Sequence, residues 1–65
     1  MIGTEVSFTP MTPREKQIAN SLGVTGWRVI DVAEDVICFG NAPGTLITKN
    51  GHLRWVRTAQ IIKEA

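Results

Sequence analysis

Three basic residues of this sequence flank an asparagine and a glycine. Lys49, His52 and Arg54 surround Asn50 and Gly51. Asparagine followed by glycine between two apolar runs is typical of a two-residue hairpin turn. Such a turn places Lys49 opposite His52 and puts Arg54 on the same face. The pattern therefore predicts a small basic face, and basic side chains grouped in this way can contact phosphate groups.

Two interpretations of this basic face remain open. In the first, the face binds nucleic acid, with Arg28 and Arg57 as further contacts. In the second, it is a solvated outer face whose positive charges discourage pairing with other strands. Seven Lys or Arg against six Asp or Glu give a net charge of +1, which argues against nucleic-acid binding by bulk electrostatics.

Catalytic and metal chemistry have few candidate residues. His52 is the one histidine, and as the acid or base of a nuclease it would need Lys49 or Arg54 to stabilise the transition state. The sequence near it offers no second base and no orienting carboxylate, so we expect no enzymatic activity. Cys38 lies between two apolar residues and is predicted to be a buried thiol. One cysteine and one histidine cannot form a structural zinc site, so we expect no metal and no cofactor.

The other face of the predicted hairpin is apolar. The same turn sets Leu46 opposite Trp55, with Leu53 on their side, and this apolar set is predicted to face the core. Trp27 follows a glycine-rich turn. It either packs in the core or remains partly exposed, where it would contact a partner.

Length and composition indicate one small globular domain over residues 1–65. The chain is 43% hydrophobic and 20% charged, within the range of folded domains. A domain this small buries a limited core, and its single cysteine cannot form an internal disulfide. We therefore expect self-association as a homodimer to add to its stability. No apolar run could span a bilayer and no secretion signal is present, so the expected location is the cytoplasm, without membrane contact.

Local patterns predict the elements that position these residues. Thr12, Pro13 and Glu15 form a capping box, which predicts a helix over residues 13–22 that ends at Gly23. Residues 58–65 have near-helical apolar spacing, which predicts a short C-terminal helix. The predicted fold is α+β: an antiparallel sheet of about four strands in two hairpins, packed by these two helices. The predicted strands are residues 2–8 (short and weak), 27–32, 36–39, 45–49 and 52–57, with a loop at 33–35 and a turn at 41–44.

The expected function is that of a small non-enzymatic protein-interaction module, an adaptor, inhibitor or regulator of the kind that phages and plasmids encode. Its partner would be a larger protein or a second copy of the chain. The expected contacts are Trp27, an edge strand, and the polar helix face formed by Arg14, Lys16 and Gln17. The alternative is a nucleic-acid-binding regulator that uses the basic hairpin face.

Overall fold

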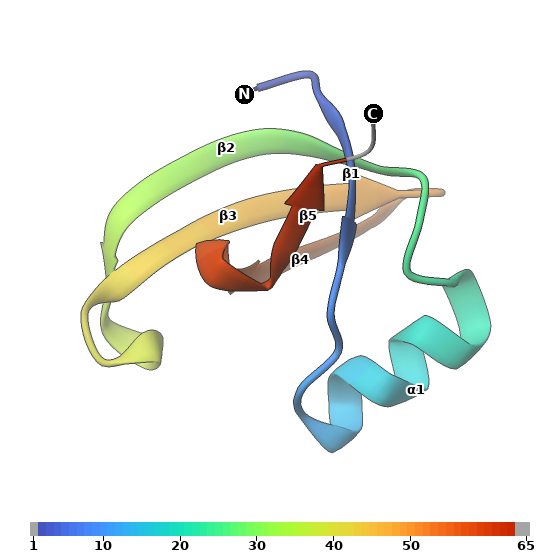
Figure 1. Cartoon of the computed structure of the whole chain (residues 1–65), viewed down its shortest axis with the longest axis horizontal. Coiled ribbons are helices and arrows are strands. Elements are labelled where there is room, and N and C mark those ends of the chain that lie inside the picture. The colour runs from blue at the N-terminus through green and yellow to red at the C-terminus, as the bar shows by residue number, and fades with distance from the viewer. Residues whose placement is uncertain (1, 64–65) are drawn as a thin grey trace.

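A computed structural model describes residues 2–63, which form one α-helix and a five-stranded antiparallel sheet (Figure 1). The α+β class is confirmed. The elements in chain order are β1 (Glu5–Phe8), α1 (Pro13–Leu22), β2 (Trp27–Val36), the 3-10 turn η1 (Ile37–Phe39), β3 (Ala42–Lys49), β4 (His52–Arg57), the 3-10 turn η2 (Thr58–Gln60) and β5 (Ile61–Lys63).

The sheet has the strand order β4-β3-β2-β1-β5, so β4 and β5 are its two edge strands. It bends around its own core, and α1 lies against one side (Figure 1). We call the side toward α1 the inner face and the opposite side the outer face. The fully buried apolar side chains lie on the inner face, with Ile18 and Leu22 of α1 packed against them: Val6, Phe8, Trp27, Val29, Ile47 and Val56.

The N-terminus of α1 follows the predicted capping box. The Thr12 hydroxyl accepts from the Glu15 amide at 3.1 Å, and the Glu15 carboxylate accepts from the Thr12 amide at 3.3 Å. Pro13 occupies the first turn, where its missing N–H leaves no hydrogen bond unmade. Gly23 ends the helix with a φ of 82°, which a residue with a side chain adopts at a cost. The predicted helix and both of its boundaries are confirmed.

The hairpin of β3 and β4 also has the predicted register. Lys49 pairs with His52 and Leu46 pairs with Trp55. Asn50 has a φ of 51° and Gly51 a φ of 81°, so both turn residues are left-handed, as a tight hairpin that matches the twist of its strands requires.

We expect Gly51→Ala to lower the free energy of unfolding by about 1 kcal/mol, because a Cβ is disfavoured at positive φ. A Cβ at this position has no heavy atom within 4 Å, so the loss would be conformational rather than steric. Urea denaturation followed by circular dichroism measures it. An unchanged midpoint would contradict the left-handed geometry.

The predicted hairpin around residues 33–35 is wrong. Strand β2 runs without a break from Trp27 to Val36, and the next three residues form η1 instead of a strand. The reversal comes at Gly40 and Asn41, which both have positive φ, so the predicted turn at 41–44 is displaced and Ala42 already begins β3. The sheet therefore contains a three-stranded meander, β2-β3-β4, in place of two separate hairpins.

The predicted C-terminal helix is also wrong. Residues 58–60 form η2, and β5 then pairs antiparallel with β1, with Phe8 opposite Ile61. The half-buried Ile61 packs against the core in this arrangement. Residues 64 and 65 of the predicted helix lie outside the described residues. The predicted first strand is confirmed in β1, which begins at Glu5.

Candidate functional site

The structure buries the face of the β3-β4 hairpin that the sequence predicts to be exposed, and it exposes the face predicted to be core. The side chains of Leu53 and Trp55, predicted to be core, are 59% and 37% exposed on the outer face. Leu46, predicted to join them, is half-buried. Ile47 and Val56 on the inner face are fully buried instead. The face that carries Lys49, His52 and Arg54 therefore turns toward α1.

Lys49 explains part of this exchange, because it binds the C-terminal end of α1. Its Nζ donates to the carbonyl oxygens of Leu22, at 2.5 Å, and Thr25, at 2.7 Å. The Leu22 carbonyl, at the end of α1, has no partner within the helix and lies at its negative dipole end, so an ammonium group stabilises it. The Thr25 carbonyl lies in the loop that follows. The residue is a link between the hairpin and the helix.

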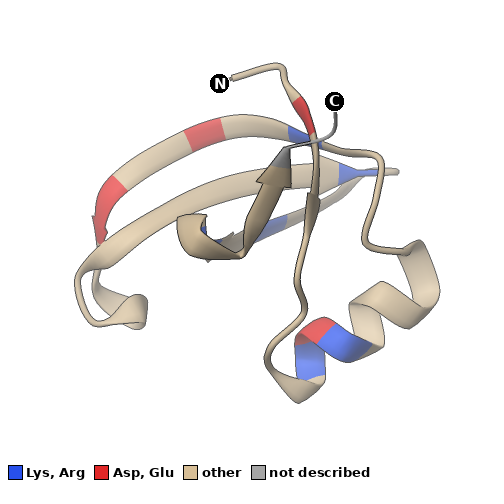
Figure 2. Cartoon of the chain, in the orientation of Figure 1, with Lys and Arg blue, Asp and Glu red and all other residues tan. Residues whose placement is uncertain are grey.

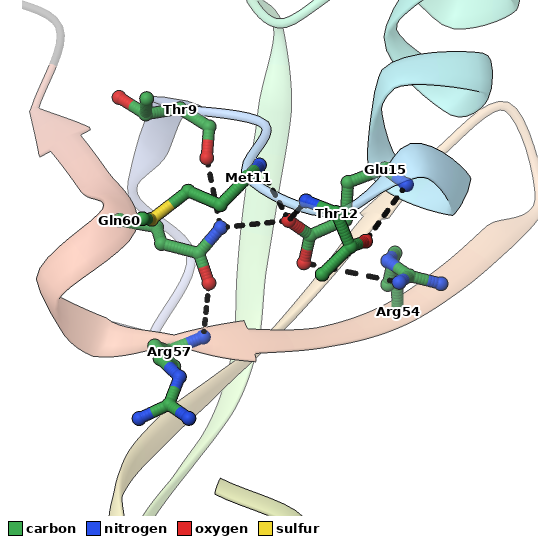
Figure 3. A network of polar contacts seen from close by, with 7 residues as sticks. All are labelled: Thr9, Met11, Thr12, Glu15, Arg54, Arg57 and Gln60. Carbon is green, nitrogen blue, oxygen red and sulfur yellow. Dashed lines mark hydrogen bonds and ion pairs between the residues drawn. The ribbon is translucent and has the colours of Figure 1, made fainter.

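Arg54 faces the other end of the same helix, where Glu15 is 4% exposed (Figure 3). The Glu15 Oε1 accepts from the backbone amides of Met11, at 2.9 Å, and Thr12, at 3.3 Å. It also accepts from Gln60 Nε2 at 2.9 Å, and Oε2 lies 3.8 Å from Arg54 Nη2. One carboxylate thus joins the start of α1 to β4 and η2.

The ionisation of Glu15 reflects these contacts. Burial raises the pKa of its carboxyl group, but the hydrogen bonds from Met11, Gln60 and Thr12 and the positive charge of Arg54 outweigh that effect. The pKa of Glu15 therefore lies below its ordinary value. The charged form is the one that the fold stabilises.

The interpretation of Trp27 as a partly exposed partner contact is wrong. Its side chain is fully buried, and its Nε1 donates to the Gly23 carbonyl at 2.9 Å. Its ring packs roughly perpendicular to the rings of Phe8, at a centroid distance of 5.5 Å, and of His52, at 6.1 Å. Trp27 is thus a core residue, and the half-buried His52 packs against it from the hairpin.

The other candidate contacts are exposed but do not form one surface. Arg14, Lys16 and Gln17 lie on the solvent side of α1, as predicted, and whether they bind a partner stays a prediction. Arg28 and Arg57 are exposed on the outer face, at opposite ends of the meander. The five predicted nucleic-acid contacts are therefore divided between the two faces, and Figure 2 shows basic and acidic residues interspersed along the sheet.

The outer face carries an open groove of about 670 Å³ between η1 and β4. We call it the outer-face groove. Its apolar lining is formed by Ala33, Val36, Ile37, Phe39, Leu53 and Trp55, and Asp35, Cys38 and Arg54 add polar groups. Ile37 is 85% exposed at the edge of this groove.

A glycine in β3 allows η1 to close one side of the groove. A Cβ on Gly44 would lie 2.6 Å from Val36 Cγ2 and 3.1 Å from the Phe39 ring. The guanidinium of Arg57 lies 5.3 Å from the centroid of the same ring, and its Nη1 donates to the Phe39 carbonyl at 3.1 Å. These contacts hold η1 against the outer face.

The residues of the groove were expected in three places: Leu53 and Trp55 in the core, residues 36–39 in a strand, and Ala33 and Asp35 in a loop. Leu53 and Trp55 alternate with polar residues, which normally marks a buried face. One signal for η1 was present in the sequence, because Gly40 and Asn41 are both residue types that tolerate positive φ. These residue types place the reversal of the chain at residues 40 and 41, directly after η1.

The predicted burial of Cys38 is wrong, because the residue is exposed in η1. We expect its thiol to react fully with a maleimide in the folded protein, at a rate within about threefold of the rate in urea. Mass spectrometry over time measures this. Labelling that requires denaturant would contradict the position of η1.

Comparisons of the chain with protein-family models, with curated proteins and with solved structures find no match. Within residues 2–63, no three His, Cys, Asp or Glu side chains lie together where they could hold a metal ion. No helix in the described part of the chain is long and apolar enough to cross a membrane.

Proposed function

We propose that this chain is a small non-enzymatic protein-interaction module, an adaptor, inhibitor or regulator, and that the outer-face groove with the adjoining strand β4 binds its partner. The observation that carries the proposal is the exposure of Leu53 and Trp55 beside Ile37. Contiguous apolar surface of this kind on a small domain is typical of an interaction site. Tryptophan is also enriched among the residues that contribute most to protein–protein binding.

The position of the cations favours this function over nucleic-acid binding. Lys49 and Arg54, the centre of the predicted basic face, donate to α1 or lie beside the Glu15 carboxylate. Phosphate contacts would have to replace these internal interactions. The proposal includes a cytoplasmic location, which the exposed and unpaired thiol of Cys38 supports.

A random peptide library selected against the wild-type chain tests the proposal. The Leu53→Glu variant serves for counter-selection, because Leu53 is exposed and a charge there alters the groove without entering the core. We expect enriched peptides that bind the wild type and lose at least about tenfold in affinity to the variant. If no enriched peptide discriminates between the two, and the wild type is monomeric at the same concentration, the groove is not an interaction site.

A further inference from the structure

We infer that the partner presents an acidic extended segment, which adds to β4 as a further antiparallel strand and covers the outer-face groove with apolar side chains. This inference rests on the proposed function and names the chemistry of its partner. Strand addition to an exposed sheet edge supplies main-chain hydrogen bonds, and alternate side chains supply specificity.

The free edge of β4 has a defined set of hydrogen-bonding groups. In a two-residue hairpin the residues that flank the turn, here Lys49 and His52, form a hydrogen-bonded pair, and such pairs alternate along the ladder. Arg54 and Val56 therefore direct their backbone groups to β3. Leu53 and Trp55 direct theirs to the opposite side, where β4 is the edge of the sheet.

Hydrogen bonding at the end of β4 limits the length of this edge. The amide of Arg57 donates to Gln60 Oε1 at 3.0 Å, so the ladder available to a partner centres on Leu53 and Trp55 (Figure 3). The other edge strand, β5, has three residues. The longer β4, with apolar side chains directly on its outer face, is the better template for an added strand.

The side chains of the same two residues point to the outer face. A residue of an added strand that lies opposite Trp55 or Leu53 shares its face, because paired residues of neighbouring strands point the same way. Two apolar side chains of the partner, separated by one residue, would then lie against Leu53 and Trp55 at the rim of the groove. The main-chain ladder and the apolar contacts thus require the same register.

The charges along β4 favour an acidic partner. Arg54 lies beside the Glu15 carboxylate on the inner face, so Arg57 is the charged side chain that β4 exposes on its outer face. The exposed Arg57 uses Nη1 for the Phe39 carbonyl, and a guanidinium has five N–H donors, so the group retains capacity for a carboxylate. A second copy of β4 would place cations beside cations, so the charges disfavour symmetric pairing.

Arg57 also fixes where the acidic residue lies. It pairs with Gly44 at the end of β4 that is remote from the hairpin turn, and its side chain shares the outer face with Leu53 and Trp55. The carboxylate therefore belongs at the Arg57 end. For an antiparallel segment, that end is N-terminal, so the expected motif has an acidic residue first and apolar residues in the third and fifth positions.

Fluorescence anisotropy with a labelled peptide tests this motif on the full chain. The probe has glutamate first, valine third, leucine fifth and threonine between them. We expect it to bind about tenfold more tightly than a matched peptide with lysine in the first position. Methylation of the backbone amide opposite Trp55 should weaken binding by about tenfold, because it removes a ladder hydrogen bond.

Variants of the chain assign the contacts. Arg57→Glu should reverse the preference, so that the lysine peptide binds more tightly, and Leu53→Glu should weaken both peptides. Asn20→Glu, an added negative charge on the exposed side of α1, should leave the affinities unchanged. Circular dichroism of each variant establishes that it is folded.

Several results would overturn the inference: equal binding of the glutamate and lysine peptides, no effect of amide methylation, self-association that the Leu53→Glu variant abolishes, or tighter binding of a single-stranded oligonucleotide. If library peptides bind through Leu53 and the acidic probe does not, the inference fails and the interaction module stands. If no peptide binding depends on Leu53 and the chain is monomeric, both fail.

Discussion

Replacing Trp27 with alanine is expected to abolish cooperative folding, whereas the same replacement at Trp55 leaves the domain folded. Trp27 is fully buried, and its indole donates to Gly23 and packs on Phe8. Truncation of a buried tryptophan costs about 3–5 kcal/mol, and a core of this size supplies only about that much stability. Trp55 is 37% exposed on the outer face, so its loss should cost about 1 kcal/mol.

Urea denaturation of the two variants, followed by circular dichroism, distinguishes these outcomes. Trp27→Phe is a useful third variant, because it keeps an aromatic ring in the core while removing the hydrogen bond to Gly23. We expect its stability to lie between those of the wild type and Trp27→Ala. Equal losses at Trp27 and Trp55 would show that both faces of the hairpin are buried, which would also remove the basis for the outer-face groove.

Loss of the Glu15 carboxylate has the second largest expected effect. Glu15→Ala leaves three donors without their acceptor, those of Met11, Thr12 and Gln60, in a site that is largely closed to water. Hydrogen bonds to a charged group contribute about 1.5–3 kcal/mol, so we expect a loss of about 3 kcal/mol from the free energy of unfolding. Thermal and urea denaturation at neutral pH measure this loss.

The Glu15→Gln variant separates hydrogen bonding from charge. All three donors bind Oε1, so an amide oxygen at the same place keeps those contacts, while its NH₂ group faces the Arg54 guanidinium. We expect a smaller loss than for alanine. If glutamine were as destabilising as alanine, the charge interaction rather than the hydrogen bonds would hold this junction.

The pH dependence of stability follows from the same residue. The pKa of Glu15 is lower in the folded chain than its ordinary value, so unfolding favours proton uptake by this group. The stabilisation is fully present above the ordinary pKa of a glutamate and is lost as the pH falls through the lowered pKa of the folded state. Stability should decline more steeply on acidification in the wild type than in Glu15→Gln, and parallel curves would contradict this.

Local signals in the sequence were sufficient for some elements. The capping box of Thr12 and Glu15 and the turn at Asn50 and Gly51 each depend on adjacent residues, so the sequence alone predicted α1 and the register of β3 with β4. Strand β5 has three residues and gains its position from β1, far away in the chain, so its apolar spacing resembled a helix.

The orientation of the sheet could not be predicted in the same way. Both faces of the hairpin offer comparable apolar side chains, and polarity favoured Leu53 and Trp55 as the core. The deciding contacts are long-range, since Lys49 binds carbonyl groups at the end of α1 and Arg54 faces the carboxylate at its start. These contacts give the basic residues of the inner face acceptors within the protein. Leu53 and Trp55 are therefore left on the outer face, where they form the candidate site.

The pairing of β1 with β5 has a consequence for the order in which the sheet forms. Val6 lies opposite Lys63, so one neighbour of β1 is made last among the described strands. The meander β2-β3-β4 joins segments that are adjacent in the chain, and such local contacts form faster than those between distant segments. We therefore expect the meander to form first and β1 to pair with β5 afterwards. Until then the inner side chains of β1 lack part of their cover.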